Sequence, residues 1–532
     1  MKHLSFFILL FLAVPVLARS GRTANIDKPD YLALPSDGVT IMRVKTTDKA
    51  TTLYFHAVGD SAFRFSIPSC SYLVDESGRR YKMTGCKNVE AGKDVCPGKK
   101  GLKFSVSFLP LPDGTERFDM IAEIFVNAGR YYYGIREGGL PLLGGKRTEQ
   151  GCASPAVAKV FPDDVFRADS MIVSGRFHDT GNYSVGGFRL EVAEYHDCID
   201  SVATNMKFGY TIIVDSTGCF SAKIPVLGPS WTSLYALKPK SPEFLDKPFT
   251  SATHYAPQAI PVVLYPGDNL HMDIYDYAGG DRRIEYKSGK TDFGKLLNNC
   301  PMAAWLYTGT TDAAKAGKCA GKETAERRMD ILDSLALYLS SKYRLGDVET
   351  QMLRTEYNVG CARDAVDEAN RVANRMIKPF LGGGPKVRTL SDTLPYIIRH
   401  SGYDVISRVK ACDNTFLVVP SYKPFMRELM ASSLSRYGSL ACENDRCETK
   451  EERILCAENK VMGAIRAFRH KPAGTDALFE QAYLMMSFRD KNNLLPGVPD
   501  ARLLEMRSRR ITLPVFSSML KLAREHFFAA EE

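Results

Sequence analysis

Cysteine is the residue type with which this sequence could do the most distinctive chemistry. The chain has 13 cysteines, and the most closely grouped are Cys442, Cys447 and Cys456. Thiol–disulfide exchange needs one stabilised thiolate and a second thiol that resolves the mixed disulfide, an arrangement that Cys-x-x-Cys provides at a helix N-terminus. The sequence contains no Cys-x-x-Cys. The chain therefore lacks the motif that standard thiol–disulfide catalysis uses.

Cys442, Cys447 and Cys456 are the candidate redox or disulfide residues. The polar stretch 443–446 between the first two is typical of a loop that a disulfide closes. In an oxidising compartment, structural disulfides and buried thiols are the expectation for the whole set, and an odd number leaves at least one cysteine unpaired in a monomer. A zinc site would need a fourth ligand, and the spacing to the nearest histidine, His470, matches no zinc module. No metal site is expected here.

Other catalytic patterns are also missing. The sequence has no His-Glu-x-x-His and no Gly-x-Ser-x-Gly, and the glycine run 382–384 is not followed by the Lys-Ser/Thr of a phosphate loop. Asp273, Asp276 and Asp281 lie close together, but they lack the ligand spacing of calcium loops, so solvated turn residues are the expected interpretation. We assign no catalytic residue and expect no cofactor.

The N-terminus predicts export. Lys2 precedes an apolar run from Leu4 to Val14, and Ala18 gives a small residue at the cleavage position, so residues 1–18 are predicted to be a secretory signal peptide. No later stretch reaches the ~20 apolar residues of a membrane-spanning helix. The mature chain is expected to be soluble in an oxidising compartment.

Composition is that of folded globular domains. Hydrophobic residues make up 45% and charged residues 25% of 532 residues, which predicts three or four domains. The net charge of +9 is small for this length, and no basic run is interleaved with aromatic residues. Nucleic acid is therefore not an expected partner.

The first predicted domain, residues 36–136, is β-sandwich-like. Apolar and polar residues alternate in 102–108 and in 63–67, with a turn signal at 75–78, which favours short antiparallel strands. The segment 130–135, with three consecutive tyrosines, predicts its last strand. Those tyrosines suit either a binding platform or, more commonly, packing in the core and at its rim. Residues 137–165 are predicted to be a surface linker.

The second predicted domain, residues 166–289, is also β-sandwich-like. Alternating runs surround the polar turn 215–218 and predict a hairpin. A second hairpin is predicted around Pro266-Gly267-Asp268, between 262–265 and 270–274.

The period changes to helical in residues 290–532. The segment 323–343 places Ile331, Leu332, Leu335 and Leu339 on one face, and 453–469 repeats the pattern. Breaks are predicted at Gly346 and at 382–385. The predicted fold class is thus α+β and multidomain, with two antiparallel β-sandwich-like domains followed by an α-helical domain.

Several segments resemble a known family. They are 53–56, 71–81, 108–112 with Phe118-Asp119, the ending Tyr133-Gly134-Ile135-Arg136, and the Pro-Gly-Asp turn at 266–268. They are similar to the N-terminal, non-catalytic region of Gram-negative envelope proteins of the TlpA-type thioredoxin family. The resemblance covers residues 36–290, and the helical region by position only. It implies a periplasmic or cell-envelope location.

The chain departs from that family where the family does its chemistry. It ends at Glu532, after the helical region, without a terminal thioredoxin domain. Two hypotheses follow. The first is a non-enzymatic envelope protein that binds an envelope partner or ligand, or supports an assembly. The alternative is a thiol-disulfide oxidoreductase or redox partner that uses a non-standard pair, with Cys442 and Cys447 as first candidates.

Overall fold

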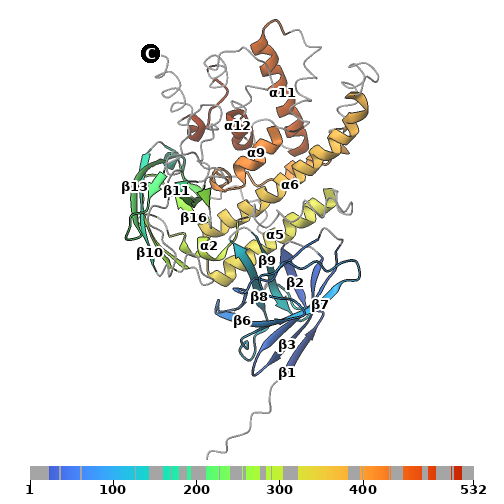
Figure 1. The fold of residues 1–532 in the computed structure, drawn as a ribbon. Helices are drawn as coiled ribbons and strands as arrows, with labels where there is room; N and C mark the ends of the chain where they lie inside the picture. Colours follow the sequence, from blue (N-terminus) through green and yellow to red (C-terminus); the bar gives the residue numbers. More distant parts are fainter. Residues whose placement is uncertain are drawn as a thin grey trace, which may run out of the picture.

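The structure is a computed structural model. It describes residues 23–517, apart from 35–37, 60–62, 126–127, 143–159, 168, 179–188, 193–210, 227, 240–253, 256–258, 276–282, 289, 291, 303–321, 382–395, 398–399, 412, 431, 433–446, 470–476, 487–504 and 506–508. The predicted signal peptide lies outside these residues. The described chain forms two β-rich parts and a C-terminal helical region (Figure 1), which confirms the predicted α+β class.

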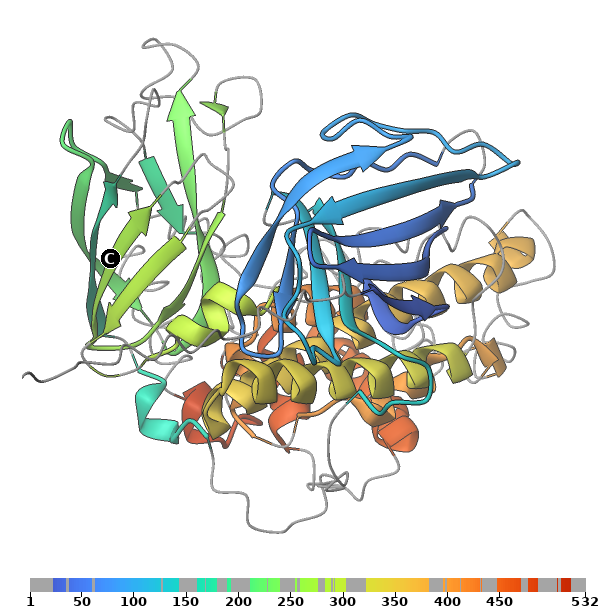
Figure 2. The same cartoon turned by 90° about the horizontal axis from the view of Figure 1, so that it is seen from below.

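The first part is a single nine-stranded antiparallel sheet. Its strands are β1 (Thr23–Asp27), β2 (Asp30–Leu34), β3 (Val39–Thr47), β4 (Thr51–Ala57), β5 (Tyr72–Asp75), β6 (Arg80–Lys87), β7 (Leu102–Phe108), β8 (Phe118–Phe125) and β9 (Ala128–Arg136). They pair in the order β1-β3-β4-β7-β6-β5-β8-β9-β2. Two residues join β1 to β2, so the sheet curls until its two edges approach (Figure 2). The predicted first sandwich is therefore one curled sheet.

The inner face of this sheet forms its own core. Phe55, Phe104 and Tyr132 pack there, and the burial of Phe104 is as the alternation in 102–108 predicts. The prediction of a strand at 63–67 is wrong, because only Phe65 forms an isolated bridge, to Val95. The alternation in 63–67 arises because Phe65 and Ile67 are buried against the core, although this segment forms no ladder of hydrogen bonds with a neighbouring strand.

The second part consists of two sheets that share one core. The four-stranded sheet has the order β13 (Cys219–Val226), β10 (Asp169–His178), β17 (Asn269–Tyr275) and β18 (Arg283–Ser288), and its β10–β17 pair is parallel. The other sheet contains β12 (Thr211–Ile213), β11 (Arg189–Val192), β14 (Ser230–Pro239), β15 (His254–Tyr255) and β16 (Ala259–Leu264), which pairs with β14. Residues from both sheets form the common core.

Both hairpin predictions in this part are wrong in the same way. β12 and β13 flank the 215–218 turn but belong to different sheets, and so do β16 and β17 around 266–268. Each turn carries the chain from one sheet to the other. The alternation correctly predicts one buried face for each strand, but it does not distinguish a hydrogen-bonded neighbour from a strand in the facing sheet.

The helical region is built on a long pair of helices. α5 (Lys322–Tyr343) and α6 (Asp347–Leu381) lie side by side. The break at Gly346 is where the sequence predicts it, whereas the predicted break at 382–385 lies outside the described residues. The other elements are η1 (Asp163–Val165), α2 (Gly294–Asn299), η3 (Tyr403–Arg408), α8 (Thr415–Val418), α9 (Tyr422–Met430), α11 (Lys450–Arg469) and α12 (Ala477–Met486). Leu332, Leu335 and Leu339 are buried as predicted, whereas Ile331 is exposed. No helix among the described residues is long and apolar enough to cross a membrane.

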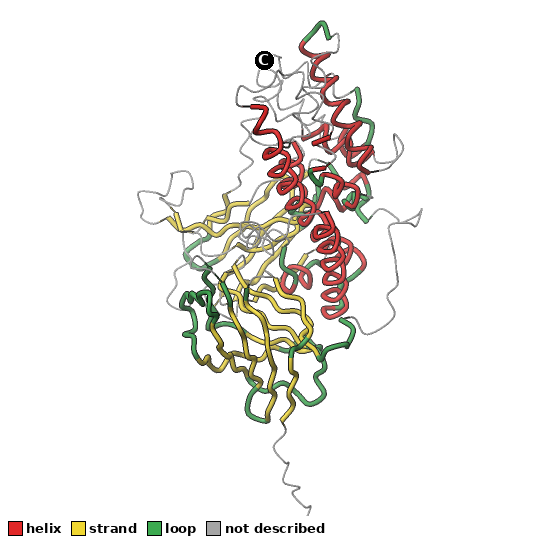
Figure 3. Tube along the Cα trace, turned by 90° about the vertical axis from the view of Figure 1, so that its right-hand side faces the viewer, coloured by secondary structure: helices red, strands yellow, loops and turns green. Residues whose placement is uncertain are grey.

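The helices lie along one side of both β-rich parts (Figure 3). The largest core is shared by all three: Tyr131 and Tyr133 enter it from the first sheet, and Trp231 and Val263 enter from β14 and β16. Phe161 belongs to the same core and is 3% exposed. At the end of the predicted surface linker, Phe161 is therefore buried in this core, whereas Pro162 and Asp164 beside it are exposed.

Candidate binding site at the junction of the three parts

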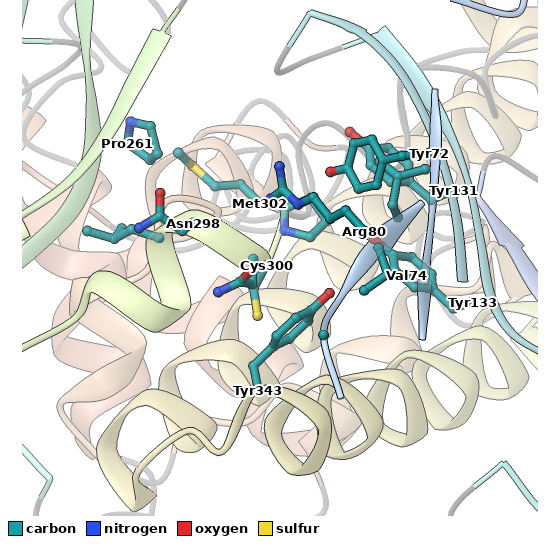
Figure 4. Close-up of a pocket in the computed structure, with 15 residues that line it drawn as sticks. Tyr72, Val74, Arg80, Tyr131, Tyr133, Pro261, Asn298, Cys300, Met302 and Tyr343 are labelled. Atoms are coloured by element: carbon teal, nitrogen blue, oxygen red, sulfur yellow. The ribbon is translucent and has the colours of Figure 1, made fainter. Parts of the chain in front are cut away.

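A pocket lies where the three parts meet. The outer face of the first sheet, β16 of the second part, and the α2 and α5 helices contribute its walls (Figure 4). Its volume is about 100 Å³. The lining residues are Tyr72, Val74, Gly78, Arg80, Ile121, Tyr131, Tyr133, Pro261, Leu297, Asn298, Asn299, Cys300, Pro301, Met302 and Tyr343.

Arg80 supplies the charge of the pocket. Its side chain reaches across toward Met302, with Tyr72 on one side and Cys300 and Tyr343 on the other (Figure 4). The Arg80 side chain is exposed, and its guanidinium carbon lies 4.6 Å from the centre of the Tyr72 ring, within cation–π range. Among the described residues, Arg80 has no carboxylate partner.

The tyrosine walls are neutral. The rings of Tyr131 and Tyr133 are parallel, with centroids 5.9 Å apart. Burial raises the pKa of Tyr133 and of Tyr343 well above the usual range, so both hydroxyls stay protonated at neutral pH. These side chains give the pocket rigid, amphipathic surfaces.

Cys300 is the thiol in the pocket wall. It is 6% exposed, and burial raises the pKa of its thiol far above the usual value. Because the thiolate is the nucleophilic form, this cysteine is inert at neutral pH. The described lining residues include no carboxylate and no histidine that would act as a general base. The pocket can bind a group, but it lacks the parts for acid–base or covalent catalysis.

A buried ion pair fixes the wall behind the pocket. Asp119 on β8 is 0% exposed and accepts hydrogen bonds from Lys342 Nζ at 2.6 Å and Tyr338 Oη at 2.8 Å, both on α5. The Gly134 N–H donates to the same carboxylate at 2.7 Å. Gly134 has a φ of 59°, which glycine adopts without strain, and the bulge there directs its N–H inward.

The same lysine touches the pocket wall. Lys342 Nζ also donates to the carbonyl of Val74, at 3.1 Å, and Val74 lines the pocket. The Lys342 side chain is 3% exposed. The ion pair therefore attaches the first sheet to α5 and fixes the position of β5 at the pocket.

A second polar cluster lies on the outer face of the four-stranded sheet. Ser174 Oγ is 3.0 Å from His271 Nδ1, and His271 Nε2 is 3.7 Å from Asp273 Oδ2. Asp273 is also 2.8 Å from His178 Nε2 and 2.9 Å from Lys287 Nζ. The order serine, histidine, aspartate is that of a nucleophilic triad, but the histidine–aspartate distance exceeds a hydrogen bond and the carboxylate is engaged elsewhere. We interpret the cluster as a surface hydrogen-bond network.

This network makes stability depend on acid pH. The hydrogen bond to His178, followed by that to Lys287, lowers the pKa of Asp273 from 3.8 to about 2. The folded state thus favours the carboxylate, so the stabilisation is complete above pH 4 and is lost as the pH falls toward 2. Because the face is open to solvent, we expect the Asp273→Asn variant to lack about 1 kcal/mol of this pH-dependent stability. Urea unfolding of both proteins between pH 5 and 2.5 measures this difference. If the free energy of unfolding falls equally steeply with pH in wild type and variant, the assignment is contradicted.

The predicted cysteine site is only partly described. Cys442 lies outside the described residues. Cys447 has a free, half-buried thiol just before α11, and Cys456 within α11 is disulfide-bonded. The loop-closing disulfide predicted at Cys447 is therefore not formed. Asp276 and Asp281 also lie outside the described residues. Among the residues that the structure describes, no group of three metal-ligating side chains occurs.

No protein-family model matches the chain, and no curated protein matches it. The function must therefore be argued from the site itself.

Proposed function

We propose that this protein is an exported protein of the Gram-negative cell envelope that binds an envelope ligand or partner at the junction pocket and does not act as an enzyme. The observation that carries the proposal is the position of the pocket. It lies on a core that all three parts share, beside a buried ion pair that holds two of them together. Pockets at the meeting point of domains are common ligand sites.

The composition of the pocket supports binding over catalysis. Its side chains are one guanidinium, neutral tyrosines, apolar residues and an inert thiol. Such a set recognises a ligand by charge and shape. Export is supported by the N-terminal pattern Lys2, Leu4–Val14 and Ala18.

A pocket-blocking variant tests the proposal. Asn299 is half-buried and lines the pocket, and within the described part of the chain its side chain donates only to Lys295 O of its own helix. Asn299→Trp should therefore fill the pocket at little cost to folding. Wild-type protein recovered from the periplasm is expected to retain an additional bound mass in native mass spectrometry, and the variant is expected to lose it.

The matched control is Lys295→Trp, which adds the same ring to an exposed position of α2 outside the pocket. It should retain the bound mass. A wild-type protein without any bound species, or one whose bound species survives Asn299→Trp, would contradict binding at this site.

A redox function is the second candidate. The observation in its favour is a free thiol at Cys447, nine positions before the disulfide-bonded Cys456. Thiol trapping under graded reductant decides between the two. Opening of one disulfide at a mild potential with rapid alkylation, and loss of insulin reduction in Cys447→Ser, would favour exchange over simple binding.

A further inference from the structure

We propose that the junction pocket binds the carboxylate of a small amphipathic acid, with Arg80 as its counter-ion. The inference rests on the proposed binding function and names the chemical class of the ligand. It is carried by the volume, the charge and the walls of the pocket.

The volume limits the ligand to a small group. Pockets that enclose a drug-sized molecule hold roughly 300–1,000 Å³, and this one holds about 100 Å³. The pocket therefore accommodates a small acid or the end of a longer chain. It is too small for a nucleotide cofactor.

The charge selects a monoanion. Arg80 is the ionised side chain among the described lining residues; it is solvent-exposed at the mouth of the pocket, and its guanidinium carbon lies 4.6 Å from the centre of the Tyr72 ring. Lys342 is close to the wall, but Asp119 already neutralises it at 2.6 Å. A guanidinium binds a carboxylate through two parallel hydrogen bonds, which satisfies one positive charge with one negative charge. A phosphate dianion would leave a negative charge without a partner.

The remaining walls leave room for a small apolar portion next to the carboxylate. Val74, Ile121, Leu297 and Met302 line the pocket together with the tyrosine rings. Ile121 and Leu297 are each 7% exposed, and Met302 is 4% exposed. A ring or short alkyl chain attached to the carboxylate would cover these surfaces, and contact with them is favourable in proportion to the apolar area removed from water.

The test uses benzoate as the probe, benzamide as a neutral molecule of the same shape, and inorganic phosphate as the other oxyanion. Ligand-observed NMR titration measures weak affinities. We expect benzoate to bind wild-type protein at least tenfold more tightly than benzamide or phosphate. Asn299→Trp should abolish this binding, which separates the pocket from nonspecific surface sites.

The variants at position 80 test the counter-ion. Arg80→Ala should weaken benzoate binding at least tenfold, and Arg80→Lys should restore it only in part, because an ammonium cannot form the paired hydrogen bonds. The matched control is Arg79→Ala, since the adjacent Arg79 lies over Tyr81 and does not line the pocket. Its affinity for benzoate should equal that of wild type.

Several results would overturn the inference. Equal affinity for benzoate and benzamide would show recognition of the ring alone, and tighter Arg80-dependent binding of phosphate would replace the carboxylate by a phosphate group. Absence of benzoate binding to folded wild-type protein would also overturn it. If native mass spectrometry still finds a bound mass that Asn299→Trp removes, only the ligand class fails. If that bound mass is absent too, the proposed function fails with it.

Discussion

Replacing Asp119 with alanine is expected to lower the free energy of unfolding by about 3–5 kcal/mol. The variant leaves the Lys342 ammonium, 3% exposed, without its carboxylate, and it leaves Tyr338 Oη and the Gly134 N–H without their acceptor. An uncompensated buried charge accounts for most of this cost. Chemical denaturation of wild type and variant at neutral pH measures it.

Two controls separate the buried pair from ion pairs in general. The double variant Asp119→Leu with Lys342→Met should lose much less stability than Asp119→Ala, because it leaves no charge in the apolar interior. Lys93→Ala removes the pair between Lys93 and Glu90, whose side chains are both 67% exposed, and should change stability by less than about 1 kcal/mol. Similar losses for Asp119→Ala and Lys93→Ala would contradict the account of the junction.

Replacing Trp231 with alanine is expected to cost about 3–5 kcal/mol. Trp231 is 1% exposed, and its side chain extends from the second β-rich part into the shared core. Its removal leaves a large cavity between that part and the helices. Hydrogen exchange at the amides of β14, β16 and α8 should accelerate together, because β16 and α8 both pack against β14.

The control for this prediction lies on the same strand. Leu234 is 0% exposed, but its side chain points to the opposite face of β14, into the core between the two sheets of the second part. Leu234→Ala should cost about 2–5 kcal/mol and leave the exchange of α8 unchanged. Faster exchange confined to β14 and β16 in Trp231→Ala would show that the shared core does not couple the parts.

The sequence predicts the individual elements well where one face of each is apolar. Strand 102–108 and helix 323–343 follow from period-2 and period-3.6 patterns. The alternation of apolar and polar residues could not reveal that the first β region is one curled sheet. That follows from the pairing of the strands: β1 and β2 are joined by two residues and yet form opposite edges of the same sheet. Nor could the alternation assign the strands around 215–218 and 266–268 to different sheets, because a buried face looks the same in either arrangement.

The site was less accessible to prediction. The segments 71–81 and Phe118-Asp119, which resemble a known family, contain Arg80 and the buried carboxylate. Their roles depend on α5, more than 200 positions away, which no local pattern connects to β8. The strand with three tyrosines combines the two interpretations, core packing and a binding surface. Tyr132 packs inside the sheet, whereas Tyr131 and Tyr133 line the pocket.

The measurement that tests the central claim most directly is native-state hydrogen exchange in increasing sub-denaturing urea, read by mass spectrometry of peptides from β9, β14 and α6. The central claim is that these elements from all three parts share one core on which the pocket depends. The account predicts that they open together, with one free energy and one dependence on urea. Opening of β14 at a lower free energy, while β9 and α6 remain protected, would contradict it.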